Sequence, residues 1–424
     1  MKKAVFTVIM LLAMVVFAFG AGFNIYEFGA RSSAMGGATV ARAWDASTIF
    51  FNPAGLAFLD GGQFYGGVTL IVPSAKFVGA APIFDSRVHS AKDQVFPPPG
   101  IYLSYKLGSR FAAGVGFTTP FSLGLEWKDD FPGRGVSRDV DLKSFYIHAV
   151  GAYELLPNLS IGGGLDFVKS TVNLKRNVFL FNSPGSPGYE VGTAELDGTS
   201  DWKVGFSAAL QYRADRFGFG VMYRHRINNE FNNGDATFQI FDNLSVPNVA
   251  AVASSILKNQ KVSTAITYPN YVTLGVYLGL TEKLGLESDV NVFNWSVFDR
   301  VRLDFEDDKL DAVLNENYHD SFTARLGVHY NLTDQFTLLG GYIYDTTPQP
   351  IESVSPLLPD DTRHDFSVGF SYSAGLLKVD AGYMFVSIGD RSTVENGIGR
   401  SDVGFNGTYN SHAHLFFSSV GISF

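Results

Sequence analysis

Apolar and polar residues alternate along several long segments of the chain. Between residues 202 and 212 the odd positions carry mainly small or polar side chains, and the even positions carry an apolar set: Trp202, Val204, Phe206, Ala208, Leu210 and Tyr212. The pattern recurs at 101–107, 271–280, 318–330 and 366–372. Because successive residues of a strand face opposite sides, each segment predicts a strand with one apolar and one polar face.

The connections between these strands alternate in length. Short connections fall at about residues 107–110, 155–158, 214–216, 281–283, 333–335 and 373–375. Long connections fall near residues 73–96, 120–140, 180–199, 232–261, 306–317, 346–362 and 389–411. Six short and seven long connections join fourteen strands, and both chain ends then lie on the side of the short turns. Bacterial outer-membrane barrels follow this rule, with short turns in the periplasm and long loops outside.

These features predict an all-β fold, a fourteen-stranded antiparallel transmembrane β-barrel formed by residues 61–424. A soluble β-sandwich is the alternative, but its strands average about five or six residues and its apolar faces lie inside. Here the strands are about ten residues long, and aromatic residues stand near the ends of the apolar faces. Both features favour a barrel whose apolar face meets lipid.

Composition narrows the class of protein further. Of the 424 residues, 14% are aromatic and only 17% are charged, which is too apolar for a disordered chain. The absence of cysteine excludes disulfide scaffolds and cysteine nucleophiles, and a net charge of -9 argues against nucleic acid as a partner. Since the sequence holds no metal-ligand cluster or phosphate-binding loop, we expect no cofactor and no metal.

The first 60 residues are distinct from the barrel. Residues 1–20 have the basic start, apolar stretch and small terminal residues of a signal peptide, so the mature chain is expected to begin at Ala21. A membrane anchor is the alternative, although the apolar run is short for a spanning helix. Residues 21–60 do not alternate and are too few for a core of their own, which predicts a plug inside the barrel, with a periplasmic extension as the alternative.

A motif runs through this segment: a Gly-Phe pair, a glutamate, a stretch of small residues, an aspartate and an Asn-Pro-Ala turn. The residues are Gly22, Phe23, Glu27, Asp45, Asn52, Pro53 and Ala54. Their order resembles the N-terminus of the FadL family of outer-membrane long-chain fatty acid transporters, and residues 294–296 and 342–363 are similar to later parts of that family. The resemblance implies a fourteen-stranded barrel closed by an N-terminal hatch. It also implies uptake of a hydrophobic molecule by lumen binding, hatch rearrangement and release sideways through a gap where the third strand kinks.

The third predicted strand, residues 111–127, contains Gly114 and the three candidates for a lateral gap: Gly116, Pro120 and Gly124. Proline cannot donate a ladder hydrogen bond, and glycine has no side chain to pack, so a lateral gap is physically plausible here. The alternative is that Pro120 merely begins the following loop.

Two further sets of residues are candidates for ligand contacts. Val249, Val252 and Ile256 stand at helical spacing in the loop 232–261, and with Ser245 as N-cap and Pro247 early in the helix they predict an external helix that captures ligand or packs on other loops. For an anionic head group, the alternation at 318–330 points His319 and Arg325 into the lumen. Asp289 or Glu287 on another inward face would balance such cations in a purely structural arrangement.

The C-terminal residue, Phe424, resembles the sorting signal of outer-membrane barrels, which implies the barrel assembly machinery as a partner beside membrane lipid and the hydrophobic ligand. A general hydrophilic porin is the nearest competing function, and it would need an open lumen. A barrel enzyme or an adhesin is less well supported, because His412 and His414 with Ser411 or Ser418 match no catalytic motif.

Overall fold

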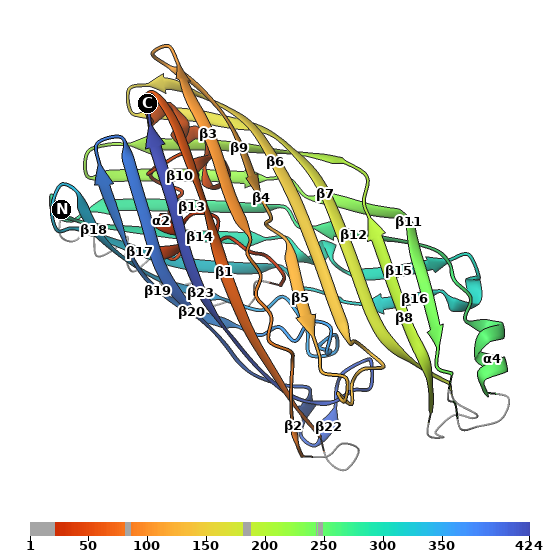
Figure 1. Cartoon of the computed structure of the whole chain (residues 1–424). Helices are drawn as coiled ribbons and strands as arrows, with labels where there is room; N and C mark the ends of the chain where they lie inside the picture. The colour runs from red at the N-terminus through yellow and green to blue at the C-terminus, as the bar shows by residue number, and fades with distance from the viewer. Residues whose placement is uncertain (1–21, 81–85, 181–187, 243, 245–248) are drawn as a thin grey trace.

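The computed structural model describes residues 22–80, 86–180, 188–242, 244 and 249–424, and the predicted signal peptide lies outside these ranges. One large sheet of antiparallel strands closes on itself, because β1 pairs with β23 over their whole lengths, from Gln63–Ser423 to Gly79–Gly407. The result is a closed fourteen-stranded barrel, which confirms the predicted fold class (Figure 1). No helix within the described ranges is long and apolar enough to cross a membrane.

Some strands of the barrel run from one end of the wall to the other without a break. They are β1 (Gly62–Gly79), β6 (Asp139–Leu156), β7 (Leu159–Leu180), β18 (Phe336–Asp345), β19 (Arg363–Ala374), β20 (Leu377–Ser392) and β23 (Gly407–Ser423). The other strands are divided into two segments by a break. The pairs of segments are β2 (Val88–Ser90) and β3 (Pro99–Leu107), β4 (Phe111–Thr118) and β5 (Ser122–Glu126), β8 (Tyr189–Thr199) and β9 (Lys203–Arg213), β10 (Phe217–Arg224) and β11 (Ile227–Ile240), β12 (Gln260–Tyr268) and β13 (Tyr271–Gly279), β14 (Leu284–Phe293) and β15 (Arg300–Phe305), and β16 (Ala312–Asn315) and β17 (Ser321–Asn331).

The short turns lie where the sequence predicts them, for example between β6 and β7 and between β19 and β20, at the barrel end that also holds the C-terminus (Figure 1). The long loops gather at the opposite end. They contain α4 (Val249–Ile256), the short helix η3 (Asp308–Leu310) and a small hairpin of β21 (Val394–Glu395) and β22 (Ile398–Gly399).

Side chains alternate across the wall as predicted. On β3, Ile101 and Leu103 are each 47% exposed on the outer face, whereas Tyr102 and Ser104 are buried inside. A protein in water would not expose so many large apolar side chains on one continuous surface, so this face is built to meet lipid. The interior differs from the small, polar lumen that alternation alone suggests, because its long-loop half is filled by aromatic and aliphatic clusters.

Residues 22–60 fill the lumen, and we call this segment the hatch. It contains α2 (Ala30–Ala34), α3 (Thr48–Phe51) and η1 (Pro53–Phe58), and Figure 1 shows it in red, surrounded by strands. Its backbone touches the wall directly at lumen-facing glycines. A Cβ on Gly341 would lie 2.1 Å from the backbone nitrogen of Gly36, and one on Gly220 would lie 2.1 Å from the carbonyl oxygen of Val40. Only glycine permits such an approach, so the wall and the hatch are matched in shape.

Candidate functional site

An apolar cavity of about 510 Å³, the outer cavity, lies at the long-loop end of the barrel. Leu174 and Leu196 of the wall line it, together with Phe305 of β15 and Leu314 of β16. Its size falls in the range of small-molecule sites, and its lining is the kind that binds apolar ligands.

The predicted external helix exists as α4, and Ile256 at its end lines the outer cavity. Val249 is half-buried and Val252 is 47% exposed, whereas Ala253 next to Val252 is fully buried. Ser245 and Pro247, the predicted start of the helix, lie outside the described residues. The helix therefore stands beside the outer cavity, and its role in capture stays a prediction.

A second cavity of about 410 Å³, the inner cavity, lies between the hatch and the wall. Phe23 and Ile25 of the hatch line it from inside. On β6 it touches Leu142, which faces the lumen, and also Lys143 and Phe145, which face the outside of the barrel. A cavity lined by both faces of one strand passes through the wall, so the inner cavity opens laterally toward the membrane.

The β-ladder is interrupted at this opening. The pairing of β3 with β4 ends at Ile101–Phe117, and β5 pairs with β6 alone among the described strands. Prolines stand on both sides of the interruption: residues 97–99 before and at the start of β3, and Pro120 between β4 and β5. None of these prolines has an N–H to donate. Pro120 therefore does more than begin a loop, because the third strand resumes after it as β5.

The hatch covers this interruption from inside. The backbone N–H of Ile25 donates to the carbonyl oxygen of Pro120 at 2.8 Å, and that of Ser122 donates to the carbonyl oxygen of Phe23 at 3.1 Å. Asn24 and Phe121 thus form an antiparallel bridge. The first described residues of the hatch act as a short extra strand on the free edge of the third barrel strand.

The two candidate glycines of the third strand have different surroundings. A Cβ on Gly124 would lie 2.3 Å from the ring of Phe96, which rests over this position at the lateral opening. A Cβ on Gly116 would lie 2.9 Å from Ile49, inside the barrel and against the hatch. Of the predicted gap residues, Gly124 therefore lies at the opening and Gly116 contacts the hatch, whereas Pro120 stands at the break between β4 and β5 without lining the cavity.

An aromatic cluster separates the outer and inner cavities. Phe23 makes edge-to-face contacts with Trp295 at 4.8 Å, Phe298 at 5.4 Å, Tyr268 at 6.1 Å and Phe121 at 6.2 Å between ring centroids. The same buried cluster continues through the wall residues Leu303 and Phe305 to the outer cavity. Phe23 is the hatch side chain at the centre of this barrier.

The motif residues of the hatch fix its fold. Asn52 accepts a hydrogen bond from the N–H of Ala54 and donates to the carbonyl oxygens of Val40 and Leu210, so one side chain joins the Asn-Pro-Ala turn to the hatch and to β9. Pro53 begins η1, where its missing N–H is not needed. Asn52, Pro53 and Ala54 thus hold the hatch in place, and they line neither the outer nor the inner cavity.

Asp45 is buried and pairs with Lys378 of β20, with 3.0 Å between Oδ2 and Nζ. Burial opposes ionisation of Asp45, but the Lys378 ammonium and the Ser47 hydroxyl outweigh it and hold the pKa of Asp45 below its ordinary value. Because the ionised form of Asp45 is favoured in the folded state, its interactions stabilise the hatch above about pH 4. This contribution is lost as the pH falls through the pKa of Asp45 in the folded state.

Replacing Lys378 by methionine is expected to leave Asp45 buried without its partner and to destabilise the hatch by about 3 kcal/mol at neutral pH. The measurement is hydrogen exchange of hatch amides as a function of pH. Protection of the wild-type hatch amides should begin to fall below about pH 4, whereas protection in the Lys378→Met variant should already be low at pH 7. Equal protection of the two proteins at pH 7 would contradict the assignment.

A buried network of polar side chains anchors the middle of the hatch. Arg224 of β10 pairs with Asp166 at 2.9 Å and donates to the carbonyl oxygen of Phe50 at 3.1 Å. Asp166 also bonds His148, whose other ring nitrogen meets Thr118 at 2.8 Å. This network resembles a catalytic triad only in composition, because its histidine, His148, is fully buried behind the hatch. His412 and His414 face outward, whereas Ser411 faces the lumen, so these residues do not converge.

The structure places the two predicted head-group residues away from both cavities. Arg325 does face the lumen, but its guanidinium stacks 3.9 Å from the centroid of Tyr26 and donates to the carbonyl oxygen of Gly37 at 3.3 Å. Arg325 is the cross-strand partner of Asp289, and Asp289 accepts hydrogen bonds from the backbone N–H groups of Thr39 and Val40. Arg325 therefore belongs to the support of the hatch, the structural alternative that the sequence left open.

The orientation predicted for His319 is wrong. β17 begins only at Ser321, and the residues before it belong to a loop that is held by other contacts. His319 is exposed and its backbone N–H donates to Pro348, while Tyr318, which alternation assigned to the outer face, is 3% exposed and packs on Phe298. Side-chain alternation does not extend into a loop, which is why the prediction failed here.

Sequence reasoning also missed residues that shape the site. Trp295 lies within the stretch 294–296 but had no assigned role, and its ring lies 2.8 Å from where a Cβ of Gly22 would stand. Arg363 donates to the carbonyl oxygen of Gly22 at 2.6 Å and so holds the start of the described hatch. The run of prolines at 97–99 was a visible signal for a broken ladder beside the third strand.

The fold and these cavities define a class: a transmembrane β-barrel with a plugged lumen, an apolar cavity at its long-loop end and a second cavity lined by both faces of one wall strand. Comparison with known proteins agrees with this class. The family model for outer membrane protein transport proteins of the OMPP1/FadL/TodX type matches residues 10–424. The chain belongs to this family, which is one of outer-membrane transport proteins rather than enzymes, and it is a multi-strand barrel of the outer membrane.

Individual relatives are distant but similar over most of their length. Outer membrane protein P1 of Haemophilus influenzae is 24% identical, with 77% of this chain and 75% of the relative covered. The long-chain fatty acid transport protein of Escherichia coli K12 is 24% identical, with 84% and 85% covered.

Solved structures show the same fold. A FadL homologue from Pseudomonas aeruginosa superimposes with a TM-score of 0.82 at 21% identity, covering 95% of this chain and all of the other. The toluene transporter TodX of Pseudomonas putida superimposes with a TM-score of 0.72 at 17% identity, covering 95% and 99%.

Proposed function

We propose that this protein takes up hydrophobic molecules from outside the cell, passes them from the outer cavity to the inner cavity, and releases them sideways into the membrane. The observation that carries the proposal is the inner cavity, which is lined by the hatch on one side and by outward-facing residues of β6 on the other. An apolar ligand moving along this path exchanges one apolar environment for another, so it avoids the cost of returning to water. Relatives named as fatty acid and toluene transporters support the class of cargo.

Movement of the hatch controls the path in this proposal. Phe23 and its aromatic partners separate the two cavities, and a few contacts hold this end of the hatch: the hydrogen bond from Arg363 to Gly22 and the backbone bonds to Pro120 and Ser122. If this end of the hatch moved away from the wall, Phe23 would leave its aromatic partners. The same movement would join the two cavities and uncover the lateral opening. These contacts are few and local, so the end of the hatch can move while Asn52 and Asp45 keep the rest in place.

The lateral route is tested by filling the opening. Gly124→Val places a branched side chain where the Phe96 ring already lies 2.3 Å from the Cβ position, and uptake of a hydrophobic ligand by whole cells is expected to fall about fivefold or more. Gly151→Val is the matched control, because a Cβ at this outward-facing position of β6 would have an ordinary contact of 3.5 Å with Phe111. Unchanged uptake in the Gly124→Val barrel, once its surface level is shown to be normal, would rule out release through this opening.

The hatch argues against a general hydrophilic porin. Its residues are nearly all buried against the wall, and its motif side chains bond to the wall. A water-filled bore would give a large steady current in a planar bilayer, whereas this arrangement predicts little current.

Phe424 also has a proposed role, as the residue that the barrel assembly machinery recognises before the barrel closes. In support, Phe424 directly follows the closing strand β23, exchanges backbone hydrogen bonds with Gly62 and leaves its side chain 61% exposed.

A further inference from the structure

Two side chains of opposite charge line the inner cavity without pairing with each other. Glu27 reaches the cavity from the hatch, and Arg363 reaches it from the start of β19. Within the described ranges the two form no ion pair with each other, and most of the remaining lining is apolar, for example Ile71, Leu142 and Leu415. Apolar walls with a few convergent polar groups are typical of a ligand site.

The carboxyl group of Glu27 is only partly hydrogen-bonded. The residue is 6% exposed, and Oε2 accepts the backbone N–H of Tyr26 at 3.1 Å, but within the part of the chain that the structure describes no hydrogen bond reaches Oε1. Burial raises the pKa of Glu27 by more than its backbone hydrogen bonds and the charges of Arg325 and Arg363 lower it. A carboxyl group in this state accepts a hydrogen bond when ionised and donates one when it carries a proton.

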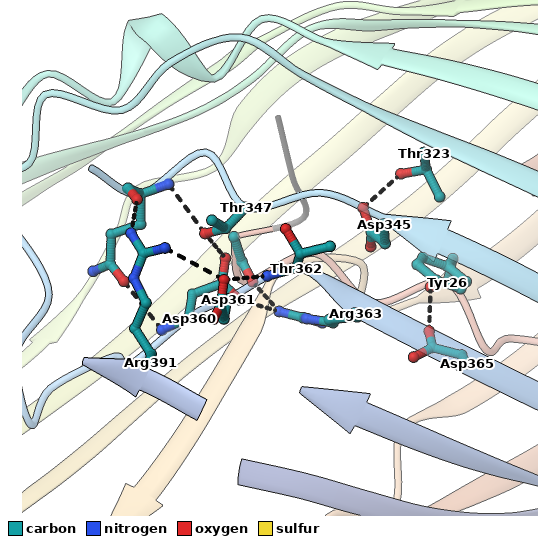
Figure 2. Close-up of polar contacts among 12 residues, drawn as sticks. Tyr26, Thr323, Asp345, Thr347, Asp360, Asp361, Thr362, Arg363, Asp365 and Arg391 are labelled. Carbon is teal, nitrogen blue, oxygen red and sulfur yellow. Dashed lines mark hydrogen bonds and ion pairs between the residues drawn. The ribbon is translucent and has the colours of Figure 1, made fainter. Parts of the chain in front are cut away.

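The guanidinium of Arg363 also keeps donors without a partner. Figure 2 shows it directed at Asp360, and Nη2 lies 2.8 Å from Oδ1 of Asp360 and 2.6 Å from the carbonyl oxygen of Gly22. Nε is buried and has no partner. Among the described residues no hydrogen bond uses Nη1, and neither Asp345 nor Asp365, which lie close by in Figure 2, forms an ion pair with Arg363.

An unpaired carboxyl oxygen and an unpaired guanidinium nitrogen are unfavourable in an apolar cavity, because each lacks hydrogen bonds that water would supply. A group placed between Glu27 and Arg363 restores both if it accepts from the guanidinium and donates to the carboxylate. A hydroxyl group does both at once. A carboxyl group does so when it shares one proton with Glu27, whereas a hydrocarbon offers neither bond.

We propose that Glu27 and Arg363 together form a head-group site in the inner cavity, which binds a hydroxyl or carboxyl group of an amphiphilic cargo between them. The inference rests on the proposed function and adds to it the part of the cargo that the cavity recognises. The apolar tail of such a cargo lies along the apolar lining, toward Leu142 and the outward-facing Phe145. The site therefore favours amphiphiles over hydrocarbons of the same length.

Displacement of radiolabelled 1-decanol from the full mature barrel in lipid nanodiscs tests the proposal, with empty nanodiscs as the blank. The competitors are unlabelled 1-decanol and 1-methoxydecane, which keeps the chain and the oxygen atom but has no O–H to donate. We expect the ether to compete about tenfold more weakly than the alcohol. Equal competition would overturn the inference and leave the proposed transport function standing. If labelled 1-decanol does not bind at all, the proposed function fails and the inference fails with it.

A pair of variants assigns the preference to Glu27. Glu27→Met keeps the length of the side chain and removes both oxygen atoms, so the alcohol and the ether are expected to compete within about threefold of each other, chiefly through weaker binding of the alcohol. Asp141→Asn is the matched control, because Asp141 lines the same cavity but already pairs with Lys143 at 2.6 Å. This control should keep the preference of the wild type.

A tenfold preference for the alcohol that persists in Glu27→Met would place the recognition elsewhere, and the proposal would be wrong. Unchanged affinity for the ether shows that the substitution has left the cavity intact. The comparison of alcohol and ether in the wild-type barrel decides the proposal whether or not this variant folds.

Discussion

A disulfide between Asn24→Cys and Phe121→Cys is expected to reduce uptake at least tenfold. The two residues face each other in an antiparallel bridge flanked by the hydrogen bonds from Ile25 to Pro120 and from Ser122 to Phe23. This is a non-hydrogen-bonded pair, for which the Cα atoms are about 4.5 Å apart, within the range that a disulfide spans. The bond would tie Phe23 to the wall and keep the two cavities separate.

The chain offers an unusually clean control for this experiment, because it contains no native cysteine. The reduced form of the same double variant carries both substitutions without the bond, so the comparison isolates the cross-link from the lost Phe121 ring. Uptake is measured in cells or liposomes before and after addition of a reductant. Full uptake with the disulfide formed would show that the start of the hatch does not have to leave the wall.

Gly341→Ala is expected to displace the hatch and to raise the steady current through a planar bilayer about tenfold or more. A Cβ at this position would lie 2.1 Å from the backbone nitrogen of Gly36 and 2.5 Å from the carbonyl carbon of Met35, so the conflict is with backbone and cannot be relieved by a rotamer change. Overpacking of this kind costs about 1 to 3 kcal/mol in a well-packed core. The hatch should also become more sensitive to protease.

Gly340→Ala is the matched control, one residue away on the same strand. A Cβ on Gly340 would have its nearest neighbour at 3.9 Å, the carbonyl oxygen of Ser367, and would face away from the hatch. This variant is expected to behave as the wild type in current and proteolysis. Equal behaviour of both variants would contradict the close fit between the hatch and the wall.

These experiments probe different ends of the hatch. The segment around Gly36 and Asn52 is fixed by backbone contact and by side chains that bond to the wall, whereas the segment around Phe23 is held by ring contacts and a few hydrogen bonds. A protein that opens only the path between its cavities, and not the whole bore, needs this difference. Loss of the first kind of contact should produce a leak, and immobilising the second should stop transport.

Much of the fold was predictable because it depends on local, periodic features. The alternation at 202–212 and the lengths of the connections predicted a closed fourteen-stranded barrel, since a strand with one lipid-facing side must repeat every second residue. The helix at Val249–Ile256 followed from spacing in the same way. The inward direction of Arg325 was also correct, because it lies within the regular part of β17.

The site depended on contacts between residues far apart in sequence, which periodicity does not encode. His319 was misplaced because the strand begins two residues later, at Ser321. Arg325 faced the lumen as predicted, yet the position of the hatch made it a support for Tyr26 and Gly37 instead of a ligand contact.

The sequence by itself determined which side of each strand meets lipid, how many strands close the barrel, and that an irregular segment precedes them. Only the tertiary structure decided that the interrupted third strand, the prolines at 97–99, Phe23 and both faces of β6 surround one cavity. The physical reason is that lipid exposure acts on each residue separately, whereas a cavity exists only where several distant segments fail to fill the space between them.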